Sequence, residues 1–140
     1  MKILAVDYGD SRTGIACCDA GEMLASPVCT IFEKRRHILP EKIAALAKEH
    51  EVGEIVVGNP LNMNGTAGPR SELAHALADD IRALVDVPVV MWDERSTTVS
   101  AIGILNQTDV RGKKRKAVID SVAAVLILEN YLSYRKNSIR

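Results

Sequence analysis

The period of the hydrophobic pattern changes near residue 36, and this change limits the possible folds more than any other feature. Before it, three extended segments joined by short turns predict an antiparallel meander at 2–8, 12–19 and 23–32. After it, helical spacing alternates with short apolar strands. The expected helices are 36–51, 69–85, 96–106 and 117–134, and the expected strands are 54–58 and 87–92.

This order predicts an α/β protein with a mixed five-stranded sheet flanked by helices. The meander would lead through right-handed crossovers into two parallel strands, and ligands of such sheets gather at the carboxyl ends of the parallel strands. Pro27 suggests an edge strand or a bulge, and Pro69 suits the first turn of a helix. Because no repeat or linker interrupts the pattern, residues 1–140 are expected to form one domain.

The composition indicates a soluble globular protein. Hydrophobic residues make up 47% of the 140 residues and charged residues 26%. The 18 basic and 18 acidic side chains cancel, so bulk charge gives no support for nucleic-acid binding. No apolar run approaches the roughly 20 residues of a membrane span, and no signal peptide is apparent, so we expect a cytoplasmic protein without membrane contact. The three cysteines lack metal-ligand spacing and are expected to be buried thiols.

Asp7 closes the first apolar strand, where an acid is costly to bury unless it is paired, protonated or bound to a cation. One interpretation is a turn cap that accepts hydrogen bonds from the amides of Gly9 or Asp10. The other is a metal ligand or an acid–base group. Glycines in the following hairpin suit a backbone that passes close to a phosphate-bearing ligand. Sugar kinases and actin-like ATPases begin with a similar hairpin, so this segment alone leaves the function open.

A second acidic segment follows the expected strand at 87–92. Its carboxylates, Asp93 and Glu94, should emerge beside Asp7 at the same edge of the sheet. In the alternative interpretation, Asp93 caps the next helix and Arg95 neutralises either acid.

Asp120 is a third acid that could reach this edge. It lies at the leading end of an apolar helix, on one face with the small residues Ala123 and Ala124, which would allow close approach to a sheet. The helix dipole favours an acid in a first turn, but it does not account for an acid on the packing face.

Three carboxylates from two strand ends and a helix could therefore converge. Oxygen-only clusters bind Mg²⁺ or Mn²⁺, and two such ions ~4 Å apart can activate water for phosphodiester displacement. A basic patch in the expected loop 108–116 is either a solvated charge run or a site for a phosphate backbone; it comprises Lys113, Lys114, Arg115 and Lys116. Aromatic residues make up only 4%, so base stacking is not expected as the main binding mode.

Four ordered blocks of the chain resemble the YqgF/RuvX family, a compact version of the RuvC-type Holliday-junction resolvases within the ribonuclease H-like fold. The resemblance covers nearly the whole chain. The blocks are Asp7-Tyr8-Gly9 with Arg12 and Gly14; Gly58-Asn59-Pro60 through Met63-Asn64-Gly65-Thr66; Asp93-Glu94-Arg95 with Thr97-Thr98; and Asp120 with Ala123-Ala124 and Ile127-Leu128.

The resemblance implies Asp7, Glu94 and Asp120 as catalytic acids and metal ligands. It also implies that the loop 59–66 borders the site, with Asn62 among the substrate-binding residues, and that Arg95 touches phosphate. Arg12 belongs to the same expected substrate-binding set. Members of the family are usually assigned a role in maturing the 5′ end of pre-16S ribosomal RNA, and junction resolution is an older inference from the fold.

Two positions depart from the family pattern. The resolvases carry an additional acid in the last helix, whereas positions 123 and 124 here are alanine. Three protein carboxylates would then bind metal more weakly, or would need the substrate phosphate to complete the site. Asn59 stands where many relatives have an apolar residue.

The leading hypothesis is a nuclease dependent on Mg²⁺ or Mn²⁺, with RNA favoured over DNA and the ribosomal small-subunit precursor as a candidate partner. Asp7 and Asp120 would hold metal, Glu94 would bind metal or orient the attacking water, and the basic patch would position substrate. The alternatives are a Holliday junction resolvase acting on DNA and a non-catalytic nucleic-acid or ribosome-assembly binding module. An actin-like or sugar-kinase ATPase is disfavoured, because those enzymes close two such domains over the nucleotide. Monomer and homodimer remain open.

Overall fold

The computed structural model describes residues 1–9, 11–60, 68–93 and 112–138, the last range by its backbone alone at 112–121 and 137–138. Its elements are β1 (Ile3–Asp7), β2 (Arg12–Cys18), β3 (Ala25–Phe32), α1 (Leu39–Glu49), β4 (Glu54–Asn59), α2 (Pro69–Arg82), β5 (Val89–Asp93) and α4 (Gly112–Ser138). None of the helices in this described part combines the length and hydropathy that a membrane span requires.

The strands form one mixed sheet in the order β3-β2-β1-β4-β5. β1 pairs antiparallel with β2 and parallel with β4, and β4 pairs parallel with β5. The expected α/β fold with a meander and two parallel strands is therefore confirmed. The expected helix at 96–106 lies outside the described residues.

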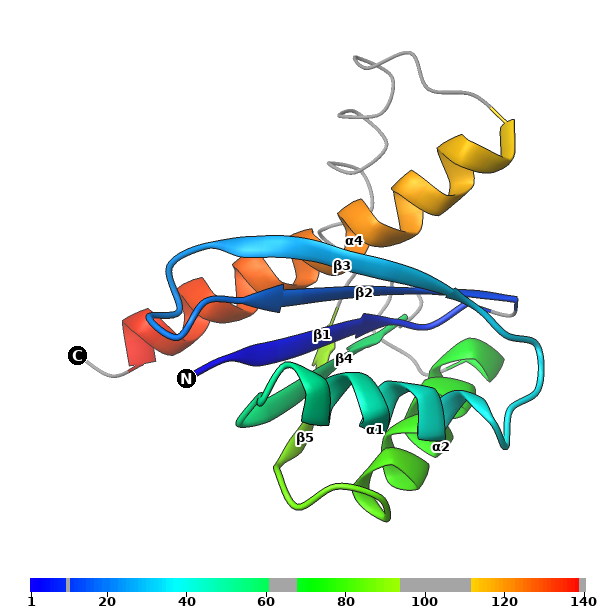
Figure 1. Ribbon diagram of the computed structural model, residues 1–140, viewed down its shortest axis with the longest axis horizontal. Helices are drawn as coiled ribbons and strands as arrows, with labels where there is room; N and C mark the ends of the chain where they lie inside the picture. The colour runs from blue at the N-terminus through cyan, green and yellow to red at the C-terminus, as the bar shows by residue number, and fades with distance from the viewer. Residues whose placement is uncertain (10, 61–67, 94–111, 139–140) are drawn as a thin grey trace.

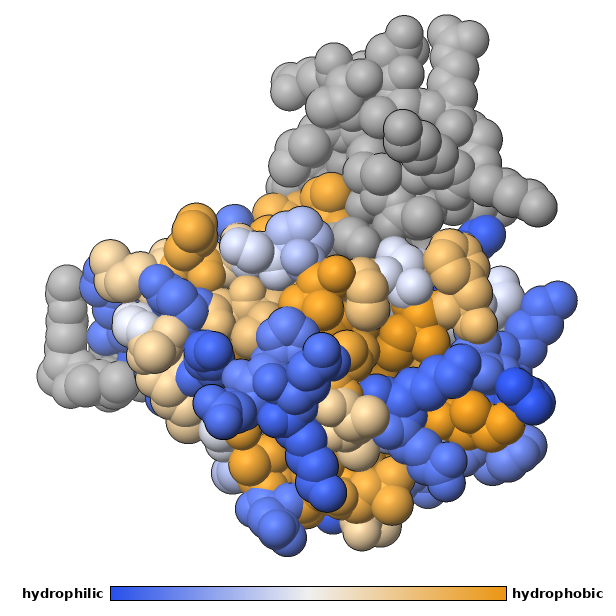
Figure 2. All heavy atoms as spheres, viewed as in Figure 1, coloured by the Kyte–Doolittle hydropathy of each residue, from blue (hydrophilic) through white to orange (hydrophobic). Residues whose placement is uncertain are grey.

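Helices cover both faces of the sheet, α1 and α2 on one and α4 on the other (Figure 1). Alternate residues of β1 supply the two layers, because successive side chains of a strand point to opposite faces. Leu4 and Val6 pack in the cluster beneath α1 and α2, whereas Ile3 and Ala5 pack against α4. Figure 2 shows hydrophilic side chains gathered over the half of the molecule where α1 and α2 lie.

The last helix begins earlier than its sequence suggests. The basic patch was expected in a loop, with the helix starting at 117, but α4 begins at Gly112 and includes residues 113–116. The loop prediction was wrong at these residues because lysine and arginine are good helix formers, and a charged run carries no apolar period to reveal a helix.

β3 is an edge strand interrupted by a bulge. Its residues Cys29 and Pro27 pair with the consecutive residues Ile15 and Ala16 of β2, so Val28 is the extra residue. The bulge exchanges the faces of the strand: Ala25 packs with the α4 cluster, although Cys29 packs with the opposite one. Both expectations for Pro27, an edge strand and a bulge, are confirmed.

Helix α1 ends in a Schellman motif whose left-handed residue is not glycine. The amide of Val52 donates to the carbonyl of Ala47 (3.1 Å), and the amide of Glu51 donates to that of Lys48 (3.1 Å). Glu51 has φ 54°, in the left-handed region where a Cβ is unfavourable. This residue is therefore a local source of strain.

Replacing Glu51 by glycine should stabilise the protein by about 1 kcal/mol, because glycine adopts the left-handed conformation without strain. The measurement is the free energy of unfolding in urea. Glu49→Gly is the matched control: it places glycine in the last turn of the right-handed helix and should destabilise by a similar amount. If Glu51→Gly lowered the free energy of unfolding as Glu49→Gly does, the assignment of strain to Glu51 would be contradicted.

A buried carboxylate fixes the chain between β3 and α1. Glu33 is 7% exposed; it accepts hydrogen bonds from Arg35 (Nε, 2.9 Å) and forms an ion pair with Lys42 (2.8 Å). The side chain of Arg35, then that of Lys42, hold the pKa of Glu33 well below its ordinary value.

Glu33→Gln should reduce stability at neutral pH more than at pH 3. A carboxyl group whose pKa is lower in the folded protein contributes stability above its unfolded pKa, and loses it as the pH falls below about 4.5. Urea unfolding at both pH values tests this, with exposed Glu49→Gln as the control. A deficit of the Glu33 variant that is as large at pH 3 as at pH 7 would show that the ion pairs are not its cause.

Candidate active site

Asp7 ends the central strand of the sheet on the face covered by α4. This placement follows from strand alternation, since Ile3 and Ala5 of the same strand pack in the α4 cluster. Its side chain is half-buried and takes part in interactions within the fold. The acid expected at the end of the first strand therefore lies at the carboxyl edge, where ligands of parallel sheets bind.

Glycines flank Asp7 on both neighbouring strands. Gly14 of β2 is its register partner. On the other side, Val6 pairs with Val57 of β4, so Gly58 comes next beside Asp7. A strand residue without a side chain allows a ligand to approach the backbone of the sheet closely.

The turn after β1 is tight, and it places Arg12 at the same edge. A Cβ at Gly9 would collide with the carbonyl oxygen of Arg12, so only glycine fits this turn. Arg12 begins β2 and lies two residues from Gly14, hence on the α4 face as well. The structure thus brings a guanidinium group to the edge that carries Asp7.

Asp93 ends β5 but belongs to the opposite face. Trp92 packs with the α4 cluster and Met91 with the other one, so alternation directs Asp93 toward the side of α1 and α2. The expectation that the Asp93 carboxylate emerges beside Asp7 was therefore wrong, because Asp93 and Asp7 belong to opposite faces of the sheet. Glu94 and Arg95 lie outside the described residues.

Asn59, at the end of β4, has a structural role that its sequence context did not reveal. The hydroxyl of Ser71 donates a hydrogen bond to Asn59 Oδ1 (2.6 Å), and Ser71 is fully buried in the first turns of α2. This contact ties the end of β4 to α2, and no local pattern announces it because the partners are twelve residues apart. Asn62, in the loop that follows, lies outside the described residues.

The C-terminal half of α4 is anchored at the opposite, amino edge of the sheet. Glu54 begins β4 and accepts hydrogen bonds from the Tyr131 hydroxyl and from Arg135 (Nη1, 3.1 Å). Arg135 also donates to Glu22 (2.8 Å). Burial, and then the Glu54 carboxylate, raise the pKa of Tyr131 to about 12, so the phenol remains a donor at neutral pH.

This anchor determines where the first half of α4 lies. Position 120 is eleven residues before Tyr131, or ~16 Å along a helix. From Glu54 to Gly58 the strand rises ~13 Å. Because α4 runs from the carboxyl edge back toward the amino edge (Figure 1), position 120 belongs to the half of the helix nearer the carboxyl edge.

Among the described side chains, no group of three or more acids, histidines or cysteines is arranged to hold a metal ion. Of the three acids expected to do so, Asp7 alone has a described side chain. Asp120 and the basic residues Lys113, Lys114, Arg115 and Lys116 are placed by the backbone of α4.

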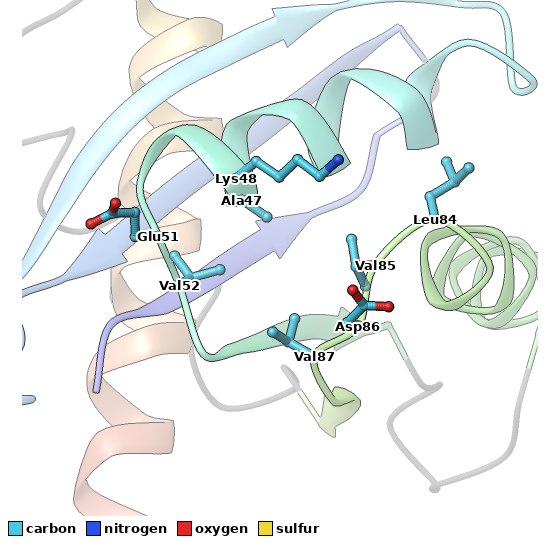
Figure 3. Close-up of a pocket in the computed structure, with 8 residues that line it drawn as sticks. All are labelled: Ala47, Lys48, Glu51, Val52, Leu84, Val85, Asp86 and Val87. Carbon is cyan, nitrogen blue, oxygen red and sulfur yellow. The ribbon is translucent and has the colours of Figure 1, made fainter.

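A cavity of about 210 Å³ lies at the amino edge, away from Asp7 (Figure 3). Its position follows from Val52 and Val87, which precede β4 and β5. The lining residues are Ala47, Lys48, Glu51, Val52, Leu84, Val85, Asp86 and Val87. None of the residues expected in the site lines this cavity.

Solved structures of low sequence identity share the fold. The Thermus thermophilus RuvC protein in complex with a Holliday junction substrate is 11% identical with a TM-score of 0.63, covering 99% of this chain and 97% of that one. The fowlpox virus Holliday junction resolvase is 13% identical with a TM-score of 0.57, covering 96% and 99%. These likenesses establish the ribonuclease H-like architecture.

Similarity in sequence is closer. A protein of Halothermothrix orenii is 44% identical over 135 residues, 96% of each chain, and one of Bacillus cereus is 45% identical over 134 residues, 94% of this chain and 98% of the relative. Both are named "Putative pre-16S rRNA nuclease". The family model described as "RuvX: Holliday junction resolvase" matches residues 1–134. The resemblance in the four sequence blocks is thus confirmed, and the chain belongs to the RuvX family.

Proposed function

We propose that this protein is a metal-dependent nuclease that hydrolyses phosphodiester bonds of RNA in the 5′-end maturation of pre-16S ribosomal RNA. The observation that carries the proposal is the position of Asp7 at the carboxyl edge of the central strand, between two glycines and on the sheet face that α4 covers. Family membership and the names of the relatives support it. The protein would act in the cytoplasm as one domain of residues 1–140.

The proposed active site joins Asp7 with Glu94 and Asp120. Glu94 follows Asp93 directly in the sequence, and the proposal requires its carboxylate to face Asp7. Asp120 would reach the same edge from the first half of α4. Asp7 and Asp120 would hold metal, and Glu94 would bind metal or orient the attacking water.

The donor chemistry fits Mg²⁺ or Mn²⁺, because carboxylate oxygens are the ligands that these cations prefer. When bound, such ions supply an activated water and stabilise the attacking and leaving oxygens of an in-line displacement. The glycines beside Asp7 would give the phosphate room to approach. Arg12, at the same edge, would hold a phosphate oxygen through its guanidinium group.

The remaining substrate contacts would come from the segments around this edge. The basic residues Lys113–Lys116 lie in the first turns of α4 and would track the phosphate backbone. Asn62 and Arg95 would contact the strand from the loop 59–66 and from the segment after β5. An RNA strand would therefore lie across the carboxyl edge of the sheet.

Asp7→Asn should abolish cleavage of an RNA that spans the pre-16S 5′ leader, while the thermal midpoint of unfolding stays close to that of wild type. The change removes a negative charge but keeps the size of the side chain. The assay compares Mg²⁺, Mn²⁺ and EDTA, and cutting should require a divalent ion. Asp86→Asn is the matched control, since Asp86 is exposed at the amino edge.

The outcomes separate the candidate functions. Normal cutting by Asp7→Asn would contradict the carboxylate assignment. Well-folded wild-type protein that binds RNA but does not cut it with any of the metals tested would indicate a binding module. Preferential cutting of a four-way DNA junction over the RNA would indicate a resolvase.

Replacing Lys113, Lys114, Arg115 and Lys116 by glutamine should weaken RNA binding and make it less sensitive to salt. Each lost phosphate contact lowers the slope of log affinity against log salt by about 0.7 for a single strand. Titrations at several salt concentrations measure this slope. Lys48→Gln, at the amino edge, is the control, and an unchanged slope in the fourfold variant would rule out phosphate contacts by these residues.

A further inference from the structure

The single phenylalanine of the chain, Phe32, is 64% exposed at the end of β3. Burial of a large apolar side chain stabilises a folded protein, and the exposed Phe32 ring forgoes most of that gain. Isolated exposed apolar residues are common, so exposure alone assigns no role. The position of Phe32 is what distinguishes it.

Phe32 is the register partner of Arg12. Ile31 packs beneath α1 and α2, so alternation directs Phe32 to the α4 face, the face of Asp7. Two pairs further along, Thr30 pairs with Gly14, which pairs with Asp7. Two strand spacings across and two residues along place Phe32 ~12 Å from Asp7, within reach of a nucleotide adjoining the one cut.

The backbone that carries Phe32 is held firmly. The amide of the next residue, Glu33, donates to the carbonyl of Ser11 (3.2 Å), so β2 and β3 remain joined beyond the Phe32–Arg12 pair. The buried Glu33 side chain is fixed in turn by Arg35 and Lys42. A ring on such a backbone is preorganised to bind, because little conformational freedom remains to be lost.

None of the other exposed large apolar side chains of the described residues lies at the end of β3 beside Arg12. Met23 and Leu24 are at the tip of the β2–β3 hairpin, and Leu84 borders the cavity before β5. Tyr134 is 55% exposed and lies against Trp92 and Tyr131, near the anchor of α4. Phe32 thus combines an exposed aromatic ring with the edge that carries Arg12 and Asp7.

We propose that Phe32 stacks on an unpaired base of the RNA strand whose phosphate is held by Arg12. The inference rests on the proposed function and adds to it the feature of the substrate that is recognised: a single-stranded nucleotide next to the cleaved bond. An aromatic face accepts any base, so this contact selects for unpaired strand rather than for sequence. One stacked base is compatible with the low aromatic content of the chain.

The test measures binding of a fluorescently labelled single-stranded RNA by anisotropy, in EDTA so that cleavage does not intervene. Phe32→Ala should weaken binding about tenfold, the usual size of a lost base–aromatic contact. Phe32→Trp should bind as well as wild type. Phe32→Leu, which keeps apolar bulk but has no π-face, should behave like Phe32→Ala. Tyr134→Ala, the matched exposed aromatic near the C-terminal end of α4, should bind normally.

A scan of abasic positions then locates the stacked base. Removing that one base should weaken binding by wild type about tenfold but leave binding by Phe32→Ala unchanged, because the same contact is already missing. RNA duplex of the same sequence should bind wild type and Phe32→Ala equally. Thermal unfolding checks that each variant is folded.

Equal binding of single-stranded RNA by wild type and Phe32→Ala would overturn the stacking proposal even if metal-dependent cleavage is observed. Rescue by Phe32→Leu would also overturn it, because an apolar contact rather than stacking would then suffice. Weaker binding by Phe32→Ala together with a wild type that never cuts would overturn the nuclease function and retain the stacking contact. A wild type that binds no RNA would overturn both.

Discussion

The burial of β1 on both faces is the constraint on which the rest of the structure depends. Residues Ile3 through Val6 have no exposed surface, and each of the larger ones contributes roughly 1.5–3 kcal/mol when buried. A strand of this kind needs a neighbour on each side and a layer of helices on each face. The antiparallel β2, the parallel β4 and the two helical layers meet these requirements. Asp7 is consequently held at the end of the most constrained strand of the sheet.

The two edges of the sheet have different tasks. At the amino edge, Glu54 accepts hydrogen bonds from Tyr131 and Arg135, and Arg135 reaches on to Glu22. These contacts are specific in direction, so they fix how far α4 is shifted along the sheet, which apolar packing alone would define poorly. The carboxyl edge receives the opposite end of the same helix. The position of the acid on α4 in the proposed site is thus determined by polar contacts about three helical turns away.

The sequence predicted the fold well where local patterns reflect burial. The apolar run of β1, the helical period of α2 after Pro69 and the edge character of Pro27 all appear in the structure. Contacts between distant residues were not predictable: nothing near Asn59 indicates its hydrogen bond to Ser71, and Glu33 looks like any surface acid although it is buried among cations. For the site, the apolar strand pattern predicted that Asp7 ends the first strand. The face to which the Asp93 side chain belongs was not predictable, because it follows from the observed packing of Met91 and Trp92.

The bulge in β3 has a consequence for solubility. An edge strand exposes amide and carbonyl groups that another chain can pair with, and this is a common route to aggregation. Val28 breaks the regular spacing of these groups in the middle of β3, and the adjoining Pro27 has no amide hydrogen to offer. A foreign strand could therefore extend the sheet at this border for only a few residues, which protects the protein at the high local concentrations that arise during its synthesis.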